Sequence, residues 1–265
     1  LVTLLTLFSF LFTSSCSSDD DSTPTVITPA TYEFLRNGTS TVSYNGQLER
    51  QEMLSEIKSY LQKGDQGLAI DANVLLNMFA NENEPFSSVN LNSSTKQLQD
   101  KTFLGDVSFY QQLMAAAESA SEEVVENGTT ASAGQAGLLT RGTSGNTILV
   151  NEKGWEFTQM IEKGLMGSVF YHQIFNVYLA DQRTGDDIEN TELVSDQNYT
   201  PMEHHWDEAF GYWGVPVDYP AGDPVLPAEL DRFWAAYTYD RDALLNVNEP
   251  LMNAYKRGRA AIVAK

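Results

Sequence analysis

The chain has 265 residues, of which 36 are acidic and 16 are basic, so its formal net charge is -20. This charge argues against nucleic acid as a partner, because proteins bind nucleic acid by neutralising its phosphates with Lys and Arg. The length suits one domain or two small lobes once an N-terminal signal and tether are subtracted.

The start of the chain predicts a lipoprotein. Residues 1–12 are almost wholly apolar and uncharged, which is typical of the central part of a secretory signal peptide and too short to span a bilayer. Small residues and then Cys16, the only cysteine, follow this run and resemble a bacterial lipobox. The resemblance implies a signal peptide over 1–15 and acylation of Cys16, and the alternative is an ordinary signal with an incidental cysteine. Because the chain starts without Met or a basic segment, we expect a few residues to precede it.

A disordered acidic tether is predicted over residues 16–30. Pro24 and Pro29 lie in a polar stretch that cannot form a packed core. The acidic run Asp19–Asp21 resembles the surface-export signal of Bacteroidetes lipoproteins, although it could equally be part of a plain solvated tether. We therefore expect attachment to the outer membrane through lipid, with the body exposed on the cell surface.

Four helices are predicted within the first half of the body, residues 31–127. Apolar residues recur near helical spacing in each of them. Asp71 and Asp106 are suitable N-caps, and Gly64 and Gly128 are stop signals. The predicted helices cover Gln47–Lys63, Asp71–Ala80, Thr95–Phe103 and Asp106–Glu126.

The second half is predicted to cover residues 146–265, after an exposed linker at 128–145 that is rich in Gly, Ala, Ser and Thr. Apolar residues leave few solvent-facing positions in Glu152–Leu179, which predicts a central buried helix there. Gly164 and Gly167 would weaken this helix, so we expect a neighbouring helix to approach closely at both positions.

Two more helices are predicted near the C-terminus, at Pro227–Tyr239 and Asn248–Lys265. A polar connection is predicted at Asp181–Tyr199. The last helix runs to the end of the chain without a stop signal, so we expect further helices beyond it. The predicted fold class is therefore all-α, a helical bundle of one or two lobes.

The helix that begins after Thr200 carries two of the three histidines. Thr200 and Glu203 have the spacing of a capping box, and Pro201 suits the first helical position. Gly211, Gly214 and Pro216 are stop signals. An apolar stripe that should face the core is formed by Met202, Trp206, Phe210 and Trp213.

A metal site on this helix is the sharpest hypothesis. His205 and Glu208 lie one turn apart, so their side chains can reach one ion, and imidazole with carboxylate suits iron or zinc. His204, Asp207 and the distant His172 are possible further ligands. The alternatives are a surface His–Glu pair beside the apolar stripe and, for His172, a hydrogen-bonded core histidine. No H-E-x-x-H motif is present, which argues against a zincin protease.

The run His205–Gly214 resembles the H-x-x-E helix of the imelysin-like proteins, and MEHHWDEAFGYWGVP is similar to a family of imelysin-related Bacteroidetes lipoproteins of unknown function. Residues 162–179 also resemble that family, and the resemblance extends from about Tyr32 to the C-terminus. It implies an all-helical bundle of two lobes and a link to iron uptake, and some imelysin-like proteins are classed as peptidases. Glu203 stands where the imelysin motif has a glycine.

Three hypotheses for function follow. The first is a surface-anchored lipoprotein that binds metal or another ligand and assists iron acquisition with an outer-membrane uptake partner. The second is a metal-dependent peptidase or other hydrolase, and the third is a structural or interaction lipoprotein without metal. The first is preferred and an enzyme is not, because the resemblance and the acidic charge agree with binding and no catalytic base can be named.

Overall fold

The structure is a computed structural model that describes residues 25–142, 144–219 and 226–265. It is mainly helical, which confirms the predicted class at this level. The predicted signal peptide, Cys16 and most of the predicted tether lie outside the described residues. None of the helices in these three ranges is long and apolar enough to cross a membrane.

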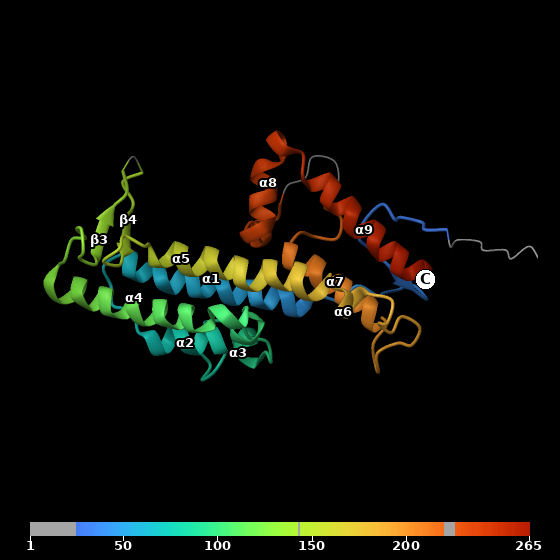
Figure 1. The fold of residues 1–265 in the computed structure, drawn as a ribbon, viewed down its shortest axis with the longest axis horizontal. Coiled ribbons are helices and arrows are strands. Elements are labelled where there is room, and N and C mark those ends of the chain that lie inside the picture. The colour runs from blue at the N-terminus through green and yellow to red at the C-terminus, as the bar shows by residue number, and fades with distance from the viewer. Residues whose placement is uncertain (1–24, 143, 220–225) are drawn as a thin grey trace, which may run out of the picture.

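Long helices run alongside one another through most of the molecule (Figure 1). The helices are α1 (Asn45–Asp65), α2 (Ala72–Ala80), α3 (Val89–Ser93), α4 (Val107–Asn127), α5 (Phe157–Leu165), α6 (Asp181–Thr184), α7 (Pro201–Trp213), α8 (Phe233–Leu245) and α9 (Asn248–Ala264). Short 3-10 helices cover Gln99–Lys101, Leu104–Asp106 and Ala228–Leu230. Two antiparallel hairpins pair β1 (Leu35–Arg36) with β2 (Thr39–Ser40), and β3 (Gly137–Thr140) with β4 (Thr147–Val150).

The predicted helices of the first half are confirmed except for Thr95–Phe103. Asp71 caps α2 as expected, because its carboxylate accepts a hydrogen bond from the backbone N–H of Asn73. The Thr95–Phe103 prediction is wrong, since this segment contains only a single 3-10 turn. The loop that leads into this turn is held by a residue of another segment. The side-chain amide of Asn81 donates hydrogen bonds to the carbonyls of Leu91, Ser94 and Lys96.

Strand β3 lies inside the segment that the sequence predicts as an exposed linker (Figure 1). Its hairpin with β4 is fastened to the bundle, because Leu149 is buried and its N–H donates to Asp65 at 2.8 Å. The other carboxylate oxygen of Asp65 accepts from Thr158 at 3.0 Å. One acidic residue at the end of α1 therefore holds both the hairpin and α5 in place.

The predicted central helix begins later and changes character partway. Asn151 organises a turn before α5, where its side chain accepts from the N–H groups of Lys153 and Trp155. After Leu165 the chain continues through two π-helical segments, Met166–Tyr171 and Gln173–Tyr178. A π turn holds more residues than an α turn, so the buried face shifts along the sequence. Phe175, which lies within the helix predicted to be buried, is consequently 51% exposed.

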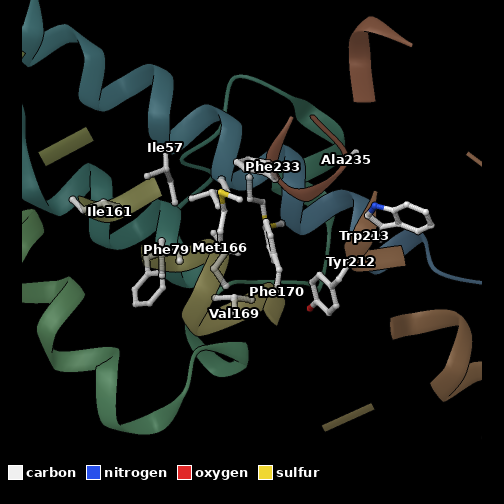
Figure 2. Packing of buried hydrophobic residues seen from close by; sticks show 14 of the residues in the cluster. Ile57, Phe79, Ile161, Met166, Val169, Phe170, Tyr212, Trp213, Phe233 and Ala235 are labelled. Carbon is white, nitrogen blue, oxygen red and sulfur yellow. The ribbon is translucent and has the colours of Figure 1, made fainter. Parts of the chain in front are cut away.

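Buried side chains from both predicted halves meet in one hydrophobic cluster. Figure 2 shows part of it, where Phe170 lies between Val169, Tyr212 and Phe233. The ring of Phe170 lies 5.3 Å from that of Tyr212 and 5.3 Å from that of Phe233. The first π-helical segment, α7 and α8 are thus joined at this ring.

The two glycines of the central helix differ, contrary to the prediction. A Cβ on Gly164 would lie 2.6 Å from the hydroxyl of Tyr110, whereas one on Gly167 would meet nothing within 4 Å. We expect Gly164→Ala to lower the free energy of unfolding by about 1–3 kcal/mol through overpacking. Gly167→Ala should raise it by up to about 1 kcal/mol through helix propensity. Urea unfolding of both variants checks this, and equal effects at the two sites would contradict it.

Candidate functional site

Helix α7 begins after Thr200 as predicted and ends before Gly214, although it continues through Gly211, the first of the predicted stop signals. Thr200 accepts a hydrogen bond from the N–H of Glu203, and the Glu203 carboxylate accepts from the N–H of Thr200 at 2.8 Å, so the capping box is confirmed. Gly214 follows the last turn with a φ of 87°, a left-handed conformation that favours glycine.

The buried face of α7 differs from the predicted apolar stripe. Phe210 and Trp213 are buried as expected, but Met202 and Trp206 are only partly buried. Their place on the buried face is taken by Glu203 and Asp207, which are 1% and 0% exposed. Two carboxylates at this depth require partners, because burying an unpaired charge is costly.

The principal partner of both carboxylates is Arg259 of α9, whose side chain is fully buried. Its guanidinium donates to Asp207 at 3.0 Å and to Glu203 at 3.0 Å. A third bond, at 2.9 Å, goes to the hydroxyl of Thr41. The planar fork of arginine serves three acceptors at once, so α7 and α9 are fixed against each other.

The N-terminal segment of the body completes this network. Arg36 donates to both oxygens of Glu203, at 2.9 and 3.1 Å. Tyr32, which is fully buried, donates to Asp207 at 2.7 Å, and the N–H of Ser43 donates to the other Asp207 oxygen. We call Glu203, Asp207, Arg259, Arg36 and Tyr32 the Arg259 network.

Protonation in the Arg259 network follows from burial and charge. Burial raises the pKa of Asp207 to about 7, against the opposing charge of Arg259. Burial also acts to raise the pKa of Glu203, but the bonds and charges of Arg36 and Arg259 outweigh it and leave that pKa below its usual value. Burial holds the pKa of the Tyr32 phenol well above 10, so Tyr32 remains a donor. The arrangement suits a structural tie between segments.

His205 lies outside this network. Its Nδ1 lies 2.8 Å from the backbone carbonyl of Arg183, to which it can only donate. Its Nε2 lies 3.5 Å from the Arg183 guanidinium. A cation at this position would oppose a metal ion on the same nitrogen.

Glu208 is approached by His204 rather than by His205. One Glu208 oxygen accepts from the side-chain amide of Gln47 at 3.0 Å, and the other lies 4.0 Å from Nε2 of His204. The His204 ring stacks on Tyr199 with centroids 4.4 Å apart. Burial lowers the pKa of His204 although the Glu208 charge acts to raise it, so the ring is neutral at physiological pH.

The remaining candidate ligands lie elsewhere or are engaged. Asp207 belongs to the Arg259 network, and His172 lies within hydrogen-bond distance of Asn176 and beside the ring of Phe103. Over residues 25–142, 144–219 and 226–265, no group of three or more His, Cys, Asp or Glu side chains could hold a metal ion. In the described part of the chain, the predicted ligands therefore contact different partners and do not converge on one point.

A family model described as "Domain of unknown function (DUF4856)" matches residues 29–265. The chain belongs to the DUF4856 family. No curated protein and no solved structure matches it. The match includes every helix of the described body, from α1 to α9.

Sequence reasoning missed the Arg259 network of this DUF4856 chain. The sequence places Glu203 in the capping box and offers Asp207 as a possible metal ligand, but it does not predict that an arginine pairs with either. The available signal was the spacing of Glu203, Asp207 and Phe210, which places both carboxylates on the same face as a core aromatic residue. That spacing indicates a buried cation, but it cannot say which of the distant arginines supplies it.

Proposed function

We propose that this DUF4856 chain is a lipid-anchored protein of the bacterial outer membrane that binds a ligand or partner and catalyses no reaction. The Arg259 network carries the proposal. It commits the two most buried carboxylates of α7 to arginines, while the His205 imidazole is held by Arg183. These pairings remove Glu203, Asp207 and His205 from the groups that a general base or a hydrolytic metal centre would use.

The way the chain enters the body is consistent with anchoring through Cys16. The backbone of Ala30 accepts from Lys256 of α9 at 2.9 Å, and the N–H of Tyr32 donates to the carbonyl of Val217 at 2.7 Å. A tether that ends here would hold the body by the end at which α9 lies, with the β3–β4 hairpin at the far end (Figure 1). Acyl chains on Cys16 would supply the membrane attachment.

One observation favours a second candidate, an iron- or zinc-binding accessory for uptake of the imelysin-like kind. His204 and Glu208 lie 4.0 Å apart, and Nδ1 of His204 is buried with no partner among the described residues. These are two ligands only, and a site of ordinary affinity needs more. Peptidase activity has less support, since it needs this metal and an open coordination position as well.

Elemental analysis separates the two candidates. We expect purified wild-type protein to contain no stoichiometric iron or zinc at neutral pH, and to cleave no peptide in an assay with a chelator control. One metal ion per chain would contradict the proposal if it were lost in His204→Ala and kept in His172→Ala. The second variant is the matched control, because His172 is the histidine that lies outside α7.

A further inference from the structure

A pocket of about 410 Å³ lies where the start of α8 meets α1 and α5 (Figure 1). Polar side chains form most of its lining. Four of the 16 basic residues of the chain are among them, although the chain has 36 acidic residues. We call this the basic pocket, and its four cations are Lys58 of α1, Lys163 of α5, Arg232 just before α8 and Arg241 within α8.

The two lysines of the basic pocket are only partly neutralised. The Nζ atoms of Lys58 and Lys163 lie 2.9 and 3.1 Å from the same oxygen of Glu162. The side chain of Glu162 is 3% exposed, whereas those of Lys58 and Lys163 are 37% and 34% exposed. One negative charge therefore faces two positive charges, and one positive charge is left for another partner.

Arg232 has only a weak partner. Its side chain is 17% exposed, and its Nη2 lies 3.9 Å from the carboxylate of Glu52, which is itself 51% exposed. Burial lowers the pKa of the Arg232 guanidinium, although the charges of Glu52 and Glu229 act to raise it. An ion pair of this length with an exposed partner contributes little. The Nε of Arg232 is buried, so a ligand in the pocket would bind at the terminal amino groups.

The start of α8 adds a partial positive charge beside Arg232. Helix N-termini attract anions because their first N–H groups lack partners within the helix. No side chain caps α8, and its first turn contains no acidic residue. Phe233 and Ala236 of this turn line the basic pocket. Because the side chain of Phe233 is buried in the core, the helix is held with its N-terminus at the pocket.

Some charges oppose an anion at this position. Asp231 and Asp240 line the pocket too, but they are exposed, as is Arg241, so water screens these three charges. The three less exposed cations then face the single carboxylate of Glu162. The formal net charge of -20 acts at longer range, and charges further away than about 8 Å are largely screened at physiological ionic strength. The local balance is therefore positive.

We infer that the basic pocket binds a phosphate group, carried by a small ester or present as the free ion. The phosphate oxygens can accept from an arginine, from lysines and from helix N–H groups at the same time. A volume of about 410 Å³ is in the range of ordinary small-molecule sites, so there is room for an ester. The assignment rests on the proposed binding function, because it names the class of ligand bound.

Isothermal titration calorimetry in a phosphate-free buffer near neutral pH tests the inference with three probes. Glycerol phosphate is a small ester, inorganic phosphate is the free ion, and glycerol lacks the charged group. We expect wild-type protein to bind both phosphates saturably and glycerol not at all. The phosphate that binds more tightly identifies the source, either the ester or the free ion.

Three variants separate a binding site from a surface charge effect. Arg232→Gln should weaken phosphate binding by about tenfold or more, in line with one charge-assisted hydrogen bond. The same change should leave the melting temperature unchanged or raise it, because it removes a partly buried charge that has no close partner. Lys163→Gln should also weaken binding, while Lys58 still neutralises Glu162. Arg257→Gln on α9 is the matched control, because Arg257 is exposed and lies outside the pocket.

Several results would overturn the inference. These are no saturable binding of either phosphate by wild type, equal binding of glycerol, and full phosphate affinity in both Arg232→Gln and Lys163→Gln. An equal loss of affinity in Arg257→Gln would also overturn it, since that loss would reflect the overall charge. Each of these results would leave the proposed non-catalytic function standing, because metal content and hydrolysis test that function.

Discussion

Replacing Arg259 with methionine is expected to lower the free energy of unfolding by about 3–5 kcal/mol at pH 8. The variant leaves Asp207 and Glu203 buried, and Arg36 can neutralise only Glu203. Arg257→Met is the matched control, because Arg257 lies two residues away on the same helix and is exposed. Its effect should stay within about 0.5 kcal/mol. Urea unfolding of both variants measures the difference, and a similar small effect for both would remove the Arg259 network from the account of the fold.

The pH dependence of Arg259→Met gives an independent check. Loss of the arginine removes the charge that opposes burial, so the pKa of Asp207 should rise above its wild-type value of about 7. At pH 6 the Asp207 carboxyl of the unfolded chain is ionised, whereas the same carboxyl in the folded variant keeps its proton. Unfolding therefore releases a proton, and the stability of the variant should fall as the pH rises from 6 to 8.

A triple variant distinguishes the loss of a pair from the loss of a charge. Adding Glu203→Gln and Asp207→Asn to Arg259→Met removes both carboxylates together with their partner. We expect the triple variant to be less destabilised than the sum of the single changes, because it leaves no unpaired buried charge. Strict additivity would show that the three groups do not act together.

Phe170→Ala is the second large effect, expected at about 3–5 kcal/mol. Phe170 is fully buried, and its ring joins the first π-helical segment to Tyr212 of α7 and Phe233 of α8 (Figure 2). Phe175→Ala is the matched control, because this ring lies five residues further along and is 51% exposed.

The same pair of variants reports on α8 in particular. Apart from Phe233 and Ala235, the residues of α8 are not fully buried, so the helix depends on few contacts. Hydrogen exchange should therefore accelerate most in α8 of Phe170→Ala, before the rest of the bundle is affected. Uniform acceleration in all helices would contradict this role of Phe170, as would a loss of stability in Phe175→Ala of equal size.

Three predictions that depend on local interactions are confirmed, whereas α1 runs past the predicted stop at Gly64 and the side chain of Asp106 makes no cap hydrogen bond. The capping box at Thr200, the N-cap at Asp71 and the stop at Gly128 are each made within a few residues, and each is present. The last helix, at Asn248–Ala264, also lies where its periodicity predicts. These features depend on backbone groups that the same short segment satisfies.

Predictions were less successful where a long-range partner decides. The helix predicted from Pro227 begins at Phe233 instead, after an extended Arg232 and with a φ of 50° at Phe233, a conformation that local propensity disfavours. The ring of Phe233 reaches Phe170 in the core, and this packing sets where α8 starts. Similarly, the hairpin whose strand β3 lies within the predicted linker depends on Asp65, which is 84 residues from Leu149 of β4.

The candidate site shows the same division. The sequence by itself determined the acidic charge, the helical class and the bounds of α7, because composition and hydrogen bonds within one or two turns are sufficient for each. Only the tertiary structure decided that Glu203 and Asp207 are paired with Arg259, which is 52 residues from Asp207 in the chain, and that His205 and Glu208 have separate partners. The physical reason is that a buried charge must be neutralised by whichever group the fold brings within about 3 Å, and helical spacing fixes only the direction in which a side chain points.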